Sequence, residues 1–191
     1  MYHITYLYVN KSGKSYNPGQ QIMKAKDFFR VIVILFILSI NIGCDQVSKS
    51  VVRSKLVYDN PVSFFHDHVH LIKVENTGAF LSFGATLPSV VKMIVFNLLP
   101  LLVIIFGLYF ILTKPELNRV TLLGLILVVG GGIGNLYDRI VHGSVTDFMH
   151  INFVIFQTGI FNVADVSITT GLLIILIYAL VKKPDVAKSE I

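Results

Sequence analysis

Charged residues and cysteine are both scarce in this chain, and each scarcity excludes a class of protein. Only 14% of the 191 residues are charged, 54% are hydrophobic, and the mean hydropathy is +0.73, which is far more apolar than a soluble domain. So much apolar surface also excludes a disordered chain, because it cannot remain in water. The single cysteine, Cys44, excludes an intramolecular disulfide framework and a multi-cysteine metal cluster.

Four apolar runs are long enough, or nearly so, for the roughly 20 residues that a helix needs to cross a bilayer. Each run is bounded by charges or helix breakers, and the stretch 31–38 lacks the polar stripe of a soluble helix. We therefore expect a membrane protein that is mainly α, with four transmembrane helices at about 28–44, 88–112, 120–137 and 161–181.

Lysine and arginine next to these runs predict the orientation of the helices, because positive residues favour the cytoplasmic side. We interpret the net charge of +5 in this way and not as a nucleic-acid site. Both termini are then cytoplasmic, and the outer loops cover about 45–87 and 138–160. The basic residues that carry this prediction are Lys24, Lys26, Arg30, Lys114, Arg119, Lys182, Lys183 and Lys188.

The chain divides into three expected parts around the apolar runs. Residues 1–22 form an N-terminal extension that is either non-native or disordered, since a normal basic flank begins at Met23 and translation is expected to start there instead of at Met1. Residues 23–181 form the four-helix domain, and residues 182–191 form a basic cytoplasmic tail. Apolar runs at 69–74 and 80–83 predict a small β-rich platform in the first outer loop.

Four aspartates converge on the outer surface in this topology. Asp45 follows the first run, Asp138 ends the third, Asp165 opens the fourth, and Asp147 lies between the last two. Ionisable groups near the membrane are costly and mark functional sites. The alternative is that they merely solvate the helix ends.

The neighbours of these aspartates favour a functional site. Glycines at 130–132 and 134 predict close helix packing, and Asn135 and Arg139 follow within about one turn. Asp138 and Arg139 point to different faces and so bind different partners. Asn162 shares a face with Asp165, and its amide either holds a carboxylate or only caps the helix.

Two carboxylates that meet in a partly dry site share a proton, because both cannot ionise cheaply. Such a pair can activate water for amide hydrolysis without a metal: the ionised carboxylate takes a proton from water and the neutral one protonates the leaving amine. The spacing does not decide which two of the four aspartates form the pair.

Five segments, in order along the chain, resemble bacterial lipoprotein signal peptidases, the type II signal peptidases. They are Asp45-Gln46-Val47-Ser48-Lys49, Glu75-Asn76-Thr77-Gly78-Ala79-Phe80, Gly131-Gly132-Ile133-Gly134-Asn135-Leu136-Tyr137-Asp138-Arg139, Val145-Thr146-Asp147-Phe148 and Phe161-Asn162-Val163-Ala164-Asp165. Ser48 and Thr146 depart mildly from the family pattern, and 80–84 is looser than the usual small-residue run.

The resemblance implies a membrane aspartyl endopeptidase that cleaves the signal peptide just before a diacylglyceryl-modified cysteine. It implies that Asp147 and Asp165 are catalytic, with water as nucleophile and with neither cofactor nor metal. It places Asn76, Asn135, Asp138, Arg139 and Asn162 around the substrate, and Asp45, Lys49, Gly78 and Ala164 in the supporting shell.

The expected partners are therefore a lipidated prolipoprotein and membrane lipids, with no nucleic acid, and the chain is expected to be a monomer. The resemblance places it in the bacterial cytoplasmic membrane as a multi-pass protein with its active site at the outer face.

Three alternatives remain open. In the first, the run before Cys44 is a lipoprotein signal and Cys44 is lipidated; otherwise we expect Cys44 to be a small buried residue. In the second, His66, His68 and His70 alternate on one face of a strand and bind a metal. In the third, the chain is a small transporter, although transporters place their polar groups near mid-bilayer.

Overall fold

The computed structural model describes residues 8–9, 15–16, 25–58, 60–79, 82–153 and 155–182. The chain forms two units, Met1–Val33 and Ile34–Ile191. The first contains a short antiparallel pair, β1 (Tyr8–Val9) and β2 (Ser15–Tyr16), and the start of α1. The rest of the expected extension 1–22, the expected start at Met23 and the tail 183–191 lie outside the described residues.

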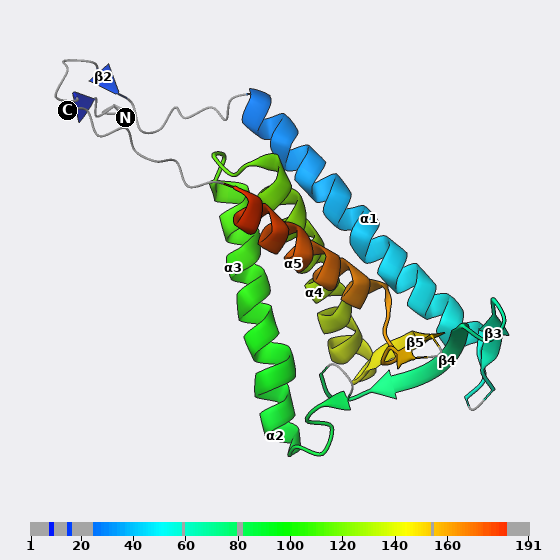
Figure 1. The fold of residues 1–191 in the computed structure, drawn as a ribbon. Helices are drawn as coiled ribbons and strands as arrows, with labels where there is room; N and C mark the ends of the chain where they lie inside the picture. The colour runs from blue at the N-terminus through cyan, green and yellow to red at the C-terminus, as the bar shows by residue number, and fades with distance from the viewer. Residues whose placement is uncertain are drawn as a thin grey trace. The chain divides into compact units, whose positions relative to one another are not determined.

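Four long apolar helices confirm the predicted fold class (Figure 1). The first is α1 (Ala25–Lys55); the second combines α2 (Ser89–Lys92), η3 (Met93–Leu98) and α3 (Leu99–Thr113); α4 (Arg119–His142) and α5 (Val163–Val181) complete the set. All four are long and apolar enough to cross a membrane.

The first helix is longer than the sequence pattern predicted, because it ends at Lys55 and not near residue 44. Asp45 therefore lies inside α1, where Lys49, one turn later, pairs with its carboxylate. Val47, between these two buried positions, and Val51, after them, are exposed. The predicted burial of Cys44 is wrong, since its side chain is exposed on α1.

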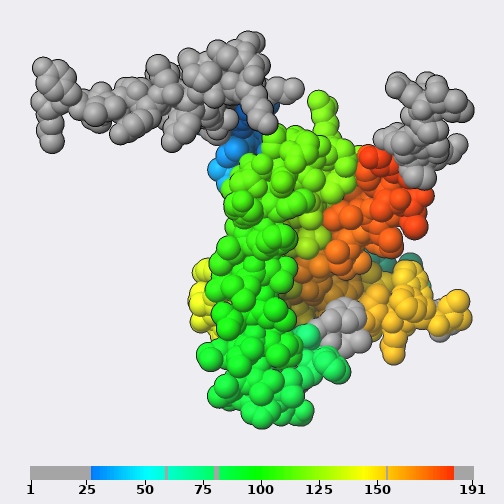
Figure 2. All heavy atoms as spheres, turned by 90° about the vertical axis from the view of Figure 1, so that its left-hand side faces the viewer, coloured from blue at the N-terminus to red at the C-terminus, as the bar shows by residue number. Residues whose placement is uncertain are grey.

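Pro100 coincides with a change of helix type in the second long helix. A proline has no N–H for the carbonyl four residues earlier, so the preceding turn must rearrange. The π-helical segment η3 lies directly before it, and α3 then has Pro100 in its first turn. Figure 2 shows this continuous helix in the foreground, in green.

A four-stranded antiparallel sheet lies at one end of α4 and α5 (Figure 1). Its order is β3 (Val62–Phe64), β4 (Val69–Asn76), β5 (Val145–Phe153) and β6 (Phe156–Gln157). The predicted strand at 69–74 falls within β4. No strand forms at Ser82 and Phe83, which lie in a turn, and residues 80 and 81 are outside the described part.

Small residues allow α4 and α5 to pack closely. A Cβ at Gly124 would lie 2.8 Å from the carbonyl oxygen of Gly171, and a Cβ at Gly131 would contact the carbonyl of Ala164. Buried aliphatic side chains from α1, α3 and α4 form the core beside them, including Ile34, Ile104 and Ile126. The sheet and these helix ends position the polar residues described below.

Candidate active site

A fully buried ammonium group joins two of the predicted aspartates. Lys49 Nζ lies 2.8 Å from Asp45 Oδ2 and 2.9 Å from Asp138 Oδ2, and all three side chains are 0% exposed. The same ammonium donates to Asn135 Oδ1 at 2.9 Å. Buried charges are stable only with partners of this kind, so this cluster ties α1 to α4.

Arg53 and Thr146 extend this cluster towards the sheet. Arg53 NH2 lies 2.8 Å from Asp138 Oδ1, and its Nε–H donates to Thr146 Oγ1 at 2.9 Å. Thr146 Oγ1 donates in turn to Glu75 Oε1 at 3.0 Å. The threonine that departs from the family pattern therefore connects α1, β4 and β5. No sequence motif predicted a role for Arg53, although it lies one turn after Lys49.

The carboxylate of Asp45 also fixes the start of α5. Asp45 Oδ1 accepts from the backbone N–H of Ala164 at 2.8 Å, and Ala164 is 0% exposed. Gly134 makes this approach possible, because a Cβ there would lie 2.5 Å from Asp45 Oδ2.

We expect Gly134→Ala to lower the free energy of unfolding by about 1–3 kcal/mol, the usual effect of overpacking a rigid site. Gly43→Ala in α1 is the matched control, since a Cβ there meets nothing within 4 Å and alanine favours a helix. Denaturant titration of both variants in detergent measures the difference. Equal stability of the two would contradict this reading of Gly134.

Asp147 lies on β5 and is held by two amides. Asn76 Nδ2 donates to its Oδ2 at 3.0 Å, and Asn162 Nδ2 donates to its Oδ1 at 2.6 Å. The side chain is 4% exposed. Burial raises the pKa of Asp147 to about 6, because desolvation disfavours the charged carboxylate; the two amide donors act in the opposite direction, and the nearby charge of Asp165 adds to the increase.

Asp165 lies in the first turn of α5 and forms a capping box with Asn162. The Asn162 side chain accepts from the Asp165 N–H at 2.9 Å, and the Asn162 N–H donates to Asp165 Oδ2 at 3.2 Å. Asn135 Nδ2 donates to Asp165 Oδ1 at 2.8 Å. Asn162 thus caps the helix and also binds Asp147, so a capping-only role is excluded.

Asn135 and Asn162 connect the buried cluster to both carboxylates. Asn135 Oδ1 accepts from Lys49 and, at 3.2 Å, from Asn162 Nδ2. Because these two donors fix the position of the Asn135 oxygen, the amide nitrogen points to Asp165. The structure therefore brings all four predicted aspartates into one hydrogen-bonded network.

Arg139 and the loop after β4 complete this region. Arg139 NH2 donates to the carbonyl oxygen of Gly78 at 2.8 Å, and the Gly78 N–H donates to Asn76 Oδ1 at 2.9 Å. A Cβ at Gly78 would lie 2.8 Å from the carbonyl oxygen of Ser82, so only glycine fits this turn. As predicted, Asp138 and Arg139 bind different partners.

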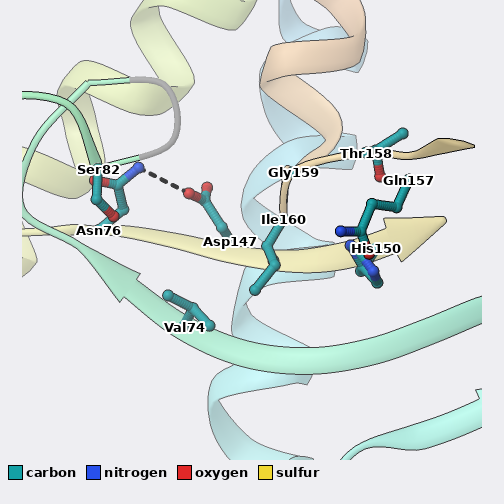
Figure 3. A pocket seen from close by; sticks show the side chains of 9 residues that line it. All are labelled: Val74, Asn76, Ser82, Asp147, His150, Gln157, Thr158, Gly159 and Ile160. Carbon is teal, nitrogen blue, oxygen red and sulfur yellow. Dashed lines mark hydrogen bonds between the residues drawn. The ribbon is translucent and has the colours of Figure 1, made fainter. Parts of the chain in front are cut away.

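A pocket of about 310 Å³ opens beside Asp147 (Figure 3). Its walls come from β4, the turn after β4, β5, β6 and the segment after β6. The residues that line it are Val74, Asn76, Ser82, Asp147, His150, Gln157, Thr158, Gly159 and Ile160. The pocket opens on one side of the Asp147 side chain.

The three histidines of the metal alternative do not share a strand face. His66 and His68 lie in the turn before β4, and only His70 belongs to the strand. His70 Nδ1 lies 2.9 Å from Ser63 Oγ. Within the described residues, no group of three or more His, Cys, Asp or Glu side chains is arranged to hold a metal ion.

Comparisons with known proteins agree with this architecture. The family model described as signal peptidase (SPase) II matches residues 19–181. A lipoprotein signal peptidase of Borrelia hermsii is 35% identical over 158 residues, covering 80% of this chain and 90% of that protein. One of Streptococcus pneumoniae is 33% identical over 155 residues, covering 81% and 94%.

Two solved bacterial membrane enzymes share the fold. The first, determined at 2.3 Å, has a TM-score of 0.72 at 24% identity and covers 83% of this chain and 94% of that one. The second, at 1.9 Å, has a TM-score of 0.69 at 28% identity and covers 79% and 94%. The family match over most of the chain confirms the resemblance predicted from the five segments: this multi-pass membrane protein belongs to the signal peptidase II family of peptidases.

Proposed function

We propose that this protein is an aspartyl endopeptidase that removes the signal peptide from diacylglyceryl-modified prolipoproteins, cleaving the bond before the lipidated cysteine. The observation that carries the proposal is the pair Asp147 and Asp165, joined through Asn162, which bonds to both carboxylates. Family membership supports the substrate class, because the relatives are lipoprotein signal peptidases.

In the proposed reaction the two aspartates act as one pair with a single shared proton. The ionised carboxylate takes a proton from water as the water oxygen attacks the scissile carbonyl carbon. The neutral carboxyl donates a hydrogen bond to the carbonyl oxygen, and the C–N bond then breaks as the cysteine nitrogen receives a proton. The pKa of Asp147, raised from 3.8 to about 6, lets the pair retain its shared proton to a higher pH than an ordinary aspartate would.

The neighbouring side chains hold the pair and the substrate. Asn76 and Asn162 fix the Asp147 carboxylate, and Asn135 fixes that of Asp165. Arg139 is partly exposed beside the pair and holds the carbonyl oxygen of Gly78, and in this proposal its guanidinium also holds the substrate backbone. A supporting shell positions these groups through the hydrogen bonds and ion pairs described above. It consists of Asp45, Lys49, Gly78, Asp138 and Ala164.

The position of the pair also suits a lipidated substrate. Asp165 opens a membrane-spanning helix and Asp147 lies on the adjacent sheet, so the site is at the end of the helices, where water and a membrane-anchored peptide both reach it. We propose a monomer in the bacterial cytoplasmic membrane, with both termini inside and this site at the outer face.

A cleavage assay with purified protein in detergent tests the substrate class. We expect the diacylglyceryl-modified prolipoprotein to be cut before its cysteine and the unmodified form to remain intact. Mass spectrometry of the product locates the cut bond. Cleavage of both forms alike would contradict the proposed requirement for the lipid.

The pH dependence of cleavage should respond to Asn76. The Asn76 amide stabilises the ionised carboxylate, so its loss in Asn76→Ala raises the pKa of Asp147 further above its usual range. The pair then keeps its shared proton to higher pH, so the alkaline limb of the kcat/KM profile shifts to higher pH. Asn60→Ala, at an exposed loop position, is the control. An unchanged or downward-shifted limb in Asn76→Ala would oppose this assignment.

A further inference from the structure

The carboxylate of Glu75 holds the ends of β4 and β5 together beside the candidate active site. Its Oε2 accepts from Ser144 Oγ at 2.6 Å, and its Oε1 accepts from Thr146 Oγ1 at 3.0 Å. Glu75 lies directly opposite Thr146 in the register of the two strands, and both hydroxyl residues are buried. Hydrogen bonds to a carboxylate are stronger than those between neutral groups, so this bridge fixes one strand end against the other.

The register of these strand ends depends on such a bridge. Between Leu71 and Val74, β4 advances by three residues while β5 advances by two. A bulge of this kind disrupts the ladder locally, and only the three pairs at 74–76 follow it before β4 ends. A slip of one residue there would turn these side chains to the opposite face of the sheet.

The opposite face of the same strand ends carries Asp147. Side chains alternate between the two faces of a sheet, so Asn76 and Asp147 lie on the face away from Glu75 and Thr146. Across that face, Asn76 Nδ2 donates to Asp147 Oδ2 at 3.0 Å (Figure 3). Asn76 directly follows Glu75 and Asp147 directly follows Thr146. The bridge therefore sets the backbone positions from which this hydrogen bond forms.

On the basis of the proposed function, we propose that Glu75 is a positioning residue for the peptidase reaction, and that it holds the Asn76 amide where that amide bonds to Asp147. Within the described residues, the side-chain partners of Glu75 are Ser144 and Thr146. Glu75 thus acts on the reacting carboxylate through its neighbour in β4 and not by direct contact.

The direction of a pH effect distinguishes this role from a simple effect of charge. Without the bridge the Asn76 amide is held less well, and the pKa of Asp147 rises, because that amide favours the ionised carboxylate. Removal of a nearby negative charge would instead lower the pKa. The charged groups that act on Asp147 stay in place, namely Asp165, Lys49 and Arg139.

The test compares Glu75→Ala with Glu75→Gln in the cleavage assay on the lipidated substrate. We expect Glu75→Ala to lower kcat by about ten- to a hundredfold, the cost of misplacing a catalytic group by up to ~1 Å, with little change in KM. Its alkaline kcat/KM limb should shift to higher pH. Glu75→Gln should keep most of kcat, because its amide accepts from one hydroxyl and donates to the other. Glu116→Ala, at an exposed position between α3 and α4, is the control and should match the wild type.

A double variant tests whether Glu75 acts through Asn76. Residues that act through one interaction are not additive. We therefore expect Glu75→Ala combined with Asn76→Ala to shift the alkaline limb no further upward than Asn76→Ala alone.

The outcomes separate this inference from the function on which it rests. Absence of cleavage by the wild type would overturn the proposed function itself. If the wild type cleaves, the positioning role is overturned by a wild-type kcat and limb in folded Glu75→Ala, by a downward shift, by an equal loss in Glu75→Gln, or by additive upward shifts in the double variant. Thermal unfolding in detergent establishes which variants are folded. If Glu75→Ala is not, Ser144→Ala, which removes only the 2.6 Å hydrogen bond, provides the test with the same expected directions.

Discussion

Asp147→Asn and Asp165→Asn are each expected to lower the rate of prolipoprotein cleavage by about two to four orders of magnitude, the usual contribution of a general acid or base. Either change removes a carboxylate from the pair that shares a proton, and an amide cannot take a proton from water. The double variant should be little worse than either single one, since the two groups act as a unit. Single-turnover cleavage of the lipidated substrate measures all three.

Asp67→Asn is the matched control for these variants. Asp67 is exposed in the turn before β4, with a φ of 64° that asparagine also tolerates, so its cleavage rate should equal that of the wild type. If folded Asp147→Asn or Asp165→Asn still cleaves at the wild-type rate, the assignment of the pair is wrong and Asp138 becomes the next candidate.

Lys49→Met is expected to destabilise the protein by about 3–5 kcal/mol, because it leaves the carboxylates of Asp45 and Asp138 buried without their shared cation. Asn135 loses the donor that orients its amide towards Asp165, so activity should fall together with stability. Denaturant titration in detergent measures the first effect and the cleavage assay measures the second.

Lys114→Met serves as the comparison for Lys49→Met. Lys114 is exposed and lies 3.9 Å from Glu116, and surface ion pairs of this kind contribute about 1 kcal/mol at most. Adding Asp45→Asn to Lys49→Met should recover part of the lost stability, since one uncompensated charge is removed. Equal stability of the two lysine variants would mean that the buried cluster does not stabilise the fold.

The four long helices could be predicted from composition and run length, since a bilayer requires about 20 apolar residues for each span. The position at which α1 ends could not be predicted in this way. Residues 45–55 contain three cationic residues and one aspartate, a composition typical of a loop. They nevertheless continue the helix, because Lys49 and Arg53 both pair with Asp138 on α4. A partner about ninety positions away in the sequence leaves no local pattern.

The sheet shows the same limit. The run at 69–74 predicted a strand by its own composition, but its main partner is β5 from the second loop. Pairing between distant strands depends on where the helices bring the loops together, and helix packing here depends on glycines such as Gly131 and Gly134, whose neighbours become known only in three dimensions.

The sequence by itself determined that this is a membrane protein with four spanning helices, and its five ordered segments identified the family. Only the tertiary structure decided how the polar residues connect: Lys49 between Asp45 and Asp138, Asn162 between the two carboxylates, and Arg53 and Thr146 joining helix to sheet. The physical reason is that hydrophobicity acts residue by residue and is readable along the chain, whereas hydrogen bonds and ion pairs depend on distances between atoms that are far apart in sequence.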